Sequence, residues 1–194
     1  TLFRSDRNVC KCMTAVRGVL LLNAVGSVAA STLPSSTIPA GVGVNIHFTT
    51  GNTQSLDLIA AAGIRVVRMD FKWASTETSK GVYDWSAYDQ LVSNLEARGL
   101  QPYFILDYSN ALYEQTGTTW IGAYPSGVYI PSPQHPLSVA AFSAWAQAAA
   151  AHYAGHNVIW EIWNEPNNVE FWKLRPNATQ YSTLALSACN AVHS

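Results

Sequence analysis

Short apolar segments alternate with helical segments between residues 42 and 192, and this alternation constrains the fold more than any other feature. Four strands are predicted, at residues 42–48, 64–71, 102–108 and 157–163. A helix follows each of them, at residues 53–62, 84–98, 138–153 and 179–192. Strands that alternate with helices predict parallel strands joined by right-handed crossovers. Since the strands are nearly continuous apolar runs, the sheet should be covered on both faces or closed on itself.

Two α/β architectures fit this order of elements. One is an open doubly wound sheet with a reordered strand, stable as a monomer and of unrelated function. The other is the N-terminal part of a (β/α)8 barrel, built from about four βα units. The pattern alone does not choose between them. Nucleotide binding is disfavoured, because the first strand runs into His47-Phe48-Thr49-Thr50-Gly51-Asn52 and not into a glycine-rich phosphate loop.

Composition excludes several classes of protein. Hydrophobic residues make up 48% and charged residues 12% of the 194 residues, which is too apolar for a disordered chain. Lys and Arg total 11 against 12 Asp and Glu, so no basic field attracts nucleic acid. His152 and His156 lie four residues apart but lack the intervening Glu of a metalloprotease helix. We expect neither a metal site nor a cofactor.

The N-terminal residues 1–30 predict a secretory signal followed by a linker at 31–41. Basic residues precede an apolar stretch that ends in small residues near Ala30, and that stretch is too short to span a membrane comfortably. An uncleaved anchor or a misplaced start is the alternative. We therefore expect a secreted protein, without a membrane segment after cleavage, whose domain covers residues 42–194. Cys10 and Cys12 would leave with the signal, and Cys189 would remain as a buried thiol or one with a partner outside this chain.

Glu165, in the sequence Asn164-Glu165-Pro166 directly after the fourth predicted strand, is the strongest candidate for chemistry. An apolar surrounding favours the neutral form of a carboxyl group, which suits a general acid near neutral pH. Pro166 should hold Glu165 in extended geometry, and strand alternation would point Glu161, Trp163 and Glu165 the same way if the strand runs that far. An isolated Glu at a strand end would otherwise be a solvated loop residue.

Further polar residues lie near the C-terminal ends of the other strands, where α/β proteins bind their ligands. His47 ends the first strand, Arg68 and Asp70 lie in the second, and Asp107 lies late in the third. The connection 109–136 shows no convincing helix or strand, and a connection of that length is usually functional or disordered. Its aromatic residues would suit the apolar faces of sugar rings, or the loop would pack on itself. These residues are Tyr113, Trp120, Tyr124 and Tyr129.

Five segments together resemble the retaining glycoside hydrolases of clan A, which are TIM barrels. The segments are GVNIHF, AGIRVVRMDFKW, GVYDWSAYDQLV, ARGLQPYFILDY and IWEIWNEPN, in that order. They look most like the family that contains β-xylosidases and α-iduronidase, with the cellulase-like family close behind. The resemblance covers roughly residues 42–192 and implies cleavage of β-linked polysaccharides or oligosaccharides.

The resemblance also implies roles for individual residues. Glu165 matches the catalytic acid/base of the clan. Asn164 matches the residue that contacts the nucleophile and the sugar 2-hydroxyl, and Arg68 matches the strand-two arginine near the nucleophile. Weaker matches to the lining of the substrate pocket are His47, Trp73, Asp107 and Trp163.

One catalytic group of the clan has no counterpart in these 194 residues. The clan's nucleophile is a Glu at the end of strand seven, whereas this sequence ends after the fourth predicted helix. Retaining hydrolysis needs two carboxyl groups about 5 Å apart, and a whole barrel takes about 250 residues. We therefore expect the N-terminal half of a glycosidase, inactive without the C-terminal half of its barrel. A non-catalytic carbohydrate-binding or interaction protein derived from such an enzyme is the alternative.

Overall fold

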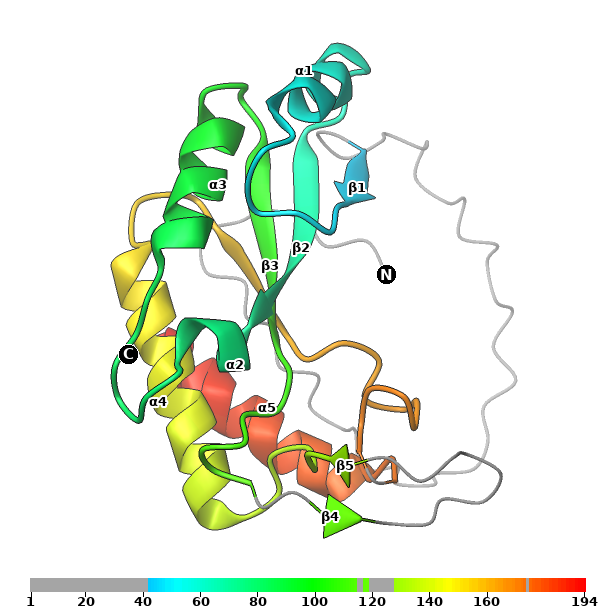
Figure 1. Ribbon diagram of the computed structural model, residues 1–194, viewed down its shortest axis with the longest axis vertical. Coiled ribbons are helices and arrows are strands. Elements are labelled where there is room, and N and C mark those ends of the chain that lie inside the picture. Colours follow the sequence, from blue (N-terminus) through cyan, green and yellow to red (C-terminus); the bar gives the residue numbers. More distant parts are fainter. Residues whose placement is uncertain (1–41, 115–116, 119–127, 174) are drawn as a thin grey trace, which may run out of the picture.

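Four parallel strands lie side by side in the order in which they occur in the chain. The computed structural model describes residues 42–114, 117–118, 128–173 and 175–194. Its main sheet has the order β1-β2-β3-β6 (Figure 1), with the strands at Gly43–Asn45, Val66–Lys72, Gln101–Asp107 and Ile159–Ile162. All three pairings are parallel. A doubly wound sheet would have required a reordered strand, so the sequential order supports the barrel architecture.

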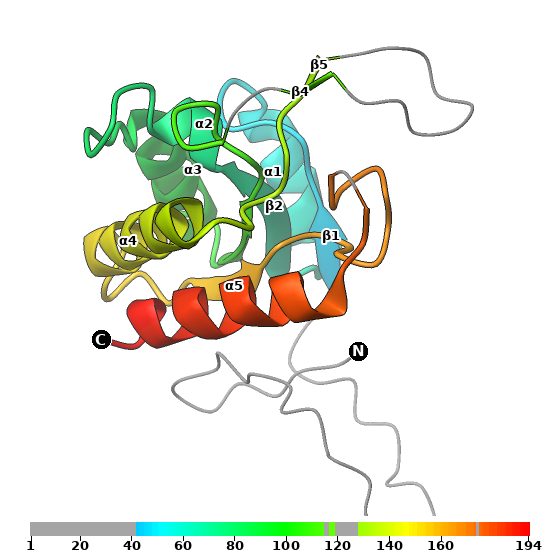
Figure 2. The ribbon, with the colours of Figure 1, turned by 90° about the horizontal axis from the view of Figure 1, so that it is seen from below.

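The helices lie on one side of this sheet. Seen along the strands, they form an arc with the strands inside it and β1 at the open side (Figure 2). The long helices are α1, α3, α4 and α5, at Thr53–Ala61, Ser86–Glu96, Pro136–His152 and Ala178–Val192. A doubly wound fold would place helices on both faces, whereas a barrel places them outside only. The fold is therefore the N-terminal part of a TIM barrel, four βα units long.

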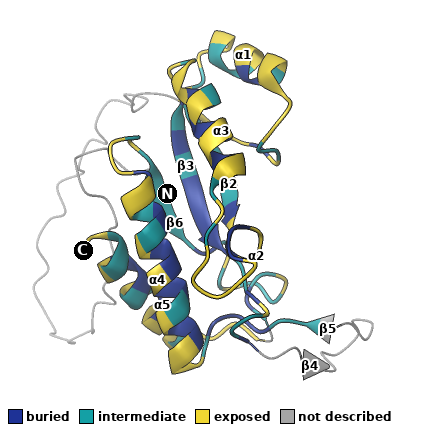
Figure 3. Cartoon of the chain, turned by 60° about the vertical axis from the view of Figure 1, so that its left-hand side comes forward, coloured by how far each residue is buried: buried dark blue, intermediate teal, exposed yellow. Residues whose placement is uncertain are grey.

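The hydrophobic core lies between the strands and the helices. Along β2, Val67, Met69 and Phe71 are buried, and the residues between them are only partly buried. The Phe71 ring packs against Phe104 of β3 at 5.3 Å and against Trp145 of α4 at 5.7 Å. Helices α4 and α5 turn their buried sides toward this core and their exposed sides outward (Figure 3). The other face of the sheet therefore carries the polar residues of β2, including Arg68 and Asp70.

The predicted elements agree with the structure within a few residues, and three short elements were not predicted. Helix α2 (Trp73–Thr76) follows β2 directly. Strands β4 (Gly117–Thr118) and β5 (Val128–Tyr129) form an antiparallel pair inside the connection 109–136, which was expected to lack regular structure. Tyr113 of this connection stacks on the buried Trp73 at 5.1 Å, so this part of the loop packs on the protein. Trp120 and Tyr124 lie outside the described residues.

The predicted signal (1–30) and linker (31–41) also lie outside the described residues, so both stay predictions. Within the described part of the chain, no helix is both long enough and apolar enough to span a membrane. Cys189 is buried on α5 and disulfide-bonded, with its partner outside the described residues. The expectation that Cys189 would be a free thiol is therefore wrong; it rested on the loss of Cys10 and Cys12 with the predicted signal.

Candidate active site

An ion pair joins β2 to β6 across the strand between them. Arg68 Nε donates to Glu161 Oε2 at 2.7 Å, and Arg68 Nη2 donates to Glu161 Oε1 at 2.9 Å. The two side chains are only 31% and 28% exposed. Burial by itself would lower the pKa of Arg68, but the Glu161 carboxylate outweighs it and raises that pKa above its usual value. Two parallel charge-assisted bonds fix the plane of the guanidinium group.

The same guanidinium group reaches Asn164 at the end of β6. Arg68 Nη2 donates to Asn164 Oδ1 at 3.0 Å, and Arg68 Nη1 donates to Asn45 Oδ1 on β1 at 3.3 Å. Arg68 therefore links three strands. Two residues predicted from the sequence, Arg68 and Asn164, are thus in direct contact. Glu161, which holds Arg68, was predicted to share a direction with Glu165 but was given no role.

Glu165 follows β6 in a tight turn, and its backbone differs from what the sequence predicted. The strand ends at Ile162, and Trp163 and Glu165 have φ angles of 66° and 42°. Both residues are in the left-handed region, so Glu165 is not extended and the strand alternation does not continue to it. Such a conformation costs about 1–3 kcal/mol for a residue other than glycine, and it is found preferentially at functional sites.

Asn168 holds both the backbone and the side chain of Glu165. Asn168 Nδ2 donates to Glu165 Oε2 at 3.1 Å, and the Asn168 backbone nitrogen donates to the Glu165 carbonyl at 2.9 Å. The Glu165 side chain is otherwise exposed. Sequence reasoning missed Asn168; its position three residues after Glu165, in an Asn-rich turn, is the signal that could have found it.

Tyr108, at the end of β3, extends the site and was also missed. Burial raises the pKa of Tyr108 well above its usual range, and the charges of Asp107 and Asp70 add to this, whereas the Asn164 side chain opposes it. The ring stacks on Phe171 with centroids 5.9 Å apart. Tyr108 therefore lies beside both Asn164 and an aromatic residue of the segment that follows Glu165.

Within the described part of the chain, no hydrogen bond joins the four remaining predicted residues to Arg68, Asn164 or Glu165, although the Trp163 ring packs edge-on against Tyr108 with centroids 5.7 Å apart. His47 is exposed after β1, and its ring is 3.2 Å from the Asn45 amide. Trp73 and Trp163 are buried in the core, with 0% and 1% of their surface exposed. Asp107 is 0% exposed. Ligand contacts by these four residues stay predictions, and for the three buried residues they would require an opening that the structure does not have.

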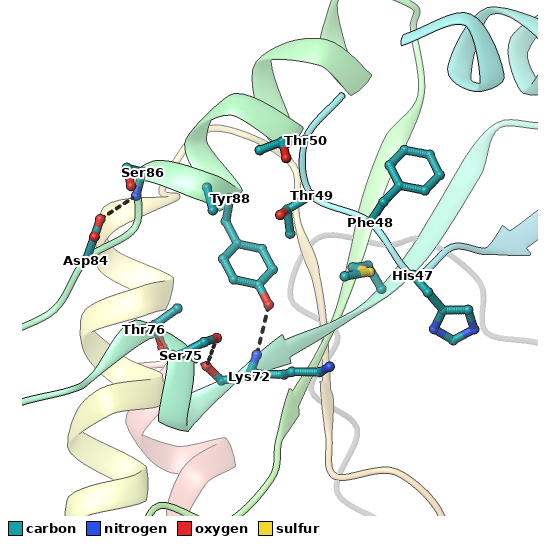
Figure 4. A pocket seen from close by; sticks show the side chains of 12 residues that line it. His47, Phe48, Thr49, Thr50, Lys72, Ser75, Thr76, Asp84, Ser86 and Tyr88 are labelled. Carbon is teal, nitrogen blue, oxygen red and sulfur yellow. Dashed lines mark hydrogen bonds between the residues drawn. The ribbon is translucent and has the colours of Figure 1, made fainter. Parts of the chain in front are cut away.

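A cavity of about 440 Å³ lies at the C-terminal ends of β1 and β2, between the 47–50 loop and α3 (Figure 4). His47, Lys72 and Tyr88 are among the residues that line it, but Arg68, Asn164 and Glu165 are not. The Tyr88 hydroxyl accepts a hydrogen bond from the Lys72 backbone nitrogen at 3.0 Å. The candidate acid/base Glu165 therefore lies outside this cavity, in the turn beyond the C-terminal end of β6.

Two other glutamates are used by the fold. Glu77 is 1% exposed and accepts hydrogen bonds from Trp73 Nε1, the Tyr113 hydroxyl and the Gly81 backbone nitrogen. Glu114 is 3% exposed and accepts from the Ser138 hydroxyl and the Gln134 backbone nitrogen. Because both carboxyl groups are buried and accept hydrogen bonds from the fold, they are poor candidates for acid/base chemistry. Within the described residues, no group of three or more His, Cys, Asp or Glu could hold a metal ion.

Residues 34–194 match the family model of cellulases, glycosyl hydrolase family 5. Among solved structures, a family 39 glycoside hydrolase of the gut symbiont Bacteroides cellulosilyticus WH2 is 25% identical, with a TM-score of 0.59. A monomeric β-xylosidase of Caulobacter crescentus CB15 is 20% identical, and a family 39 enzyme of Xanthomonas axonopodis pv. citri is 24% identical, both with TM-scores of 0.59. The likeness to the last two shows the fold alone.

These matches cover 79% of this chain but only 30%, 33% and 32% of the three solved chains, in the same order. The chain thus spans about a third of the length of the structures that it matches. No curated protein matches the sequence.

Proposed function

Because this chain belongs to the cellulase family, glycosyl hydrolase family 5, we propose that it is part of a secreted retaining O-glycoside hydrolase. Its substrate would be a β-linked polysaccharide or oligosaccharide. Glu165 would be the acid/base, and the nucleophile would be a Glu from the part of the barrel beyond the third that this chain spans. Without that Glu, these 194 residues would not hydrolyse a glycoside.

The observation that carries the proposal is the setting of Glu165. It follows a parallel strand at the C-terminal edge of the sheet, and its carboxylate is held by Asn168 at 3.1 Å. The preceding residue, Asn164, is held by Arg68, which is itself held by Glu161. In TIM-barrel enzymes this edge carries the active site. A carboxyl group that is exposed yet held in one place suits proton transfer to a bound substrate.

The reaction would use Glu165 twice. As an acid it donates its proton to the glycosidic oxygen while the second carboxylate attacks the anomeric carbon and forms a glycosyl-enzyme intermediate. As a base it then takes a proton from the water that hydrolyses this intermediate. Arg68 would contribute a fixed positive charge near the attacking carboxylate, and Asn164 would offer its amide to the sugar. General acid catalysis of this kind contributes roughly 10²- to 10⁴-fold.

Glu165→Gln, made in the protein with its whole barrel, tests this assignment. With a poor leaving group we expect kcat/KM to fall about 10²- to 10⁴-fold, because the leaving oxygen is no longer protonated. With an activated aryl glycoside the loss in the first step should be much smaller. Glu170→Gln is the matched control, since Glu170 is exposed in the same segment. Equal losses for good and poor leaving groups would reject Glu165 as the acid.

A non-catalytic carbohydrate-binding role is the second candidate, and one observation favours it. Tyr108 and Phe171 form a stacked, partly exposed aromatic pair near Asn164, with an interplanar angle of 16°. Aromatic faces bind the apolar faces of sugars. If the whole protein binds oligosaccharides but hydrolyses none, and Glu165→Gln leaves binding unchanged, the binding role replaces the catalytic one.

A further inference from the structure

Asp107, the last residue of β3, is a buried acid without a hydrogen-bond donor. Its side chain is 0% exposed, and neither Oδ1 nor Oδ2 has a hydrogen-bond partner among the described residues. An ionised carboxylate in that situation would lose its solvation without compensation, at a cost of several kcal/mol. The site therefore favours a carboxyl group that carries its own proton.

The polar groups around Asp107 do not supply the missing donor. The Tyr88 hydroxyl of α3 is already used, since it donates to the Asp70 carbonyl at 2.7 Å and accepts from the Lys72 backbone nitrogen. Arg68 of β2 is bonded to Glu161, the charged residue that β6 brings to this face. Lys72 is directly opposite Asp107 in the strand register, but its side chain is exposed and makes no hydrogen bond to the Asp107 oxygens.

The Asp70 carboxyl group is the remaining neighbour. Lys72 pairs with Asp107 in the register of β2 and β3, so Asp70, two residues before Lys72, lies on the same face as Asp107 and diagonally across from it. Two carboxylates only repel each other, whereas a carboxylic acid donates a hydrogen bond to a carboxylate. Burial first, and then the charge of Asp70, favour the protonated form of Asp107 and raise its pKa.

We propose that Asp107 is a carboxylic acid at neutral pH and donates its proton to the carboxylate of Asp70, so that the two residues form a singly charged acid pair on the inner face of the sheet. Asp107 is the protonated member of the pair, since it is fully buried. Asp70 is the charged member, because it is only partly buried and solvent can still reach its carboxylate. Burial first and Asp70 second raise the pKa of Asp107 to about 9, in agreement with this assignment.

The acid pair sets the charge at the C-terminal ends of β2 and β3. With the proton in place, the pair carries one negative charge, on the same face of the sheet as Arg68. Loss of the proton would place a second negative charge in a site without solvent, next to Tyr108. The inference does not depend on the proposed hydrolysis, because the protonation of Asp107 is measured without a substrate.

Infrared difference spectroscopy of the intact protein tests the acid pair through the carbonyl stretch of a protonated carboxylic acid. We expect this band at pH 7 in the unmodified protein, its loss near pH 9, and its absence in Asp107→Asn. In Asp70→Asn the band should disappear at a lower pH, because the neighbouring charge and the hydrogen-bond acceptor are removed. Asp57→Asn, which alters an exposed acid on α1, should leave the band and its midpoint unchanged.

Two results would overturn the proposal. One is the absence of any carboxylic-acid band at pH 7 that Asp107→Asn removes. The other is a midpoint in Asp70→Asn that equals that of the unmodified protein. If Asp107→Asn does not fold, the Asp70→Asn midpoint still decides, because that substitution leaves Asp107 in place.

Discussion

Stability of the protein should depend on pH through Asp107, and Asp107→Asn should remove that dependence. The folded-state pKa of Asp107 is raised from 3.8 to about 9, so the folded state binds this proton more tightly than the unfolded chain does. The stabilising effect of the bound proton is fully present below the unfolded pKa, near 4. It is lost progressively as the pH rises from about 4 to about 9. Asn resembles the neutral acid in shape but does not titrate.

The size of the effect follows from the two pKa values. Each unit of difference corresponds to about 1.4 kcal/mol, and at pH 7 the unfolded chain has passed its pKa of 3.8 by about three units. Between pH 4 and pH 7 the unmodified protein should therefore lose about 4 kcal/mol relative to Asp107→Asn. This is a large share of the total of about 5–15 kcal/mol that stabilises a typical domain.

Urea unfolding of both proteins at pH 4 and pH 7 measures this difference. Other titrating groups are common to the two proteins and cancel when their unfolding free energies are subtracted. Asp57→Asn is the control, because Asp57 is 63% exposed and its pair with Arg98 contributes about 1 kcal/mol or less. A difference between Asp107→Asn and the unmodified protein that is the same at both pH values would refute the reasoning, since it would mean that Asp107 has its ordinary pKa.

Two further predictions concern the contacts around Glu165. In a double-mutant cycle with Arg68→Met and Glu161→Gln, denaturant unfolding should give a coupling energy of about 2 kcal/mol, between the values for exposed and fully buried ion pairs; a value near zero would mean that water screens the pair. Asn168→Asp removes the amide donor to Glu165 but keeps the side-chain oxygen that the Glu170 backbone nitrogen contacts. In the whole enzyme it should lower kcat about tenfold with little change in KM, and an unchanged kcat would show that Asn168 does not orient Glu165.

The order of strands and helices could be predicted because each long element has its own signal in the local sequence. The apolar residues of β2, β3 and β6, the helical spacing of α3 and the Ala-rich composition of α4 are local signals, and they place those elements within a few residues. Helix α2 and strands β4 and β5 are four, two and two residues long. Elements this short contain about one period at most, so no repeat is there to recognise in the sequence.

The contacts within the site depend on strand register, which the sequence does not specify. The sequence predicted that Arg68 and Asn164 would lie toward the same edge of the sheet, because both were placed in or just after predicted strands. The ion pair between Arg68 and Glu161 also requires an offset between β2 and β6, so that the Arg68 side chain reaches across β3. Burial of Asp107 was likewise not foreseen. An acid at the end of a strand was expected at the open mouth, and only the packing around it shows that it is enclosed.

The backbone at Glu165 shows why a local rule was not sufficient. A residue before proline is normally extended, yet Glu165 has a φ of 42° before Pro166. Two backbone hydrogen bonds hold this geometry. The Trp163 backbone nitrogen donates to the Leu106 carbonyl of β3 at 3.0 Å, and the Asn168 backbone nitrogen donates to the Glu165 carbonyl. Each bond contributes about 0.5–1.5 kcal/mol, comparable to the strain at one left-handed residue. The turn that presents Glu165 is therefore stabilised by β3 and by the residues after Pro166, and not by the preferences of the Asn-Glu-Pro sequence itself.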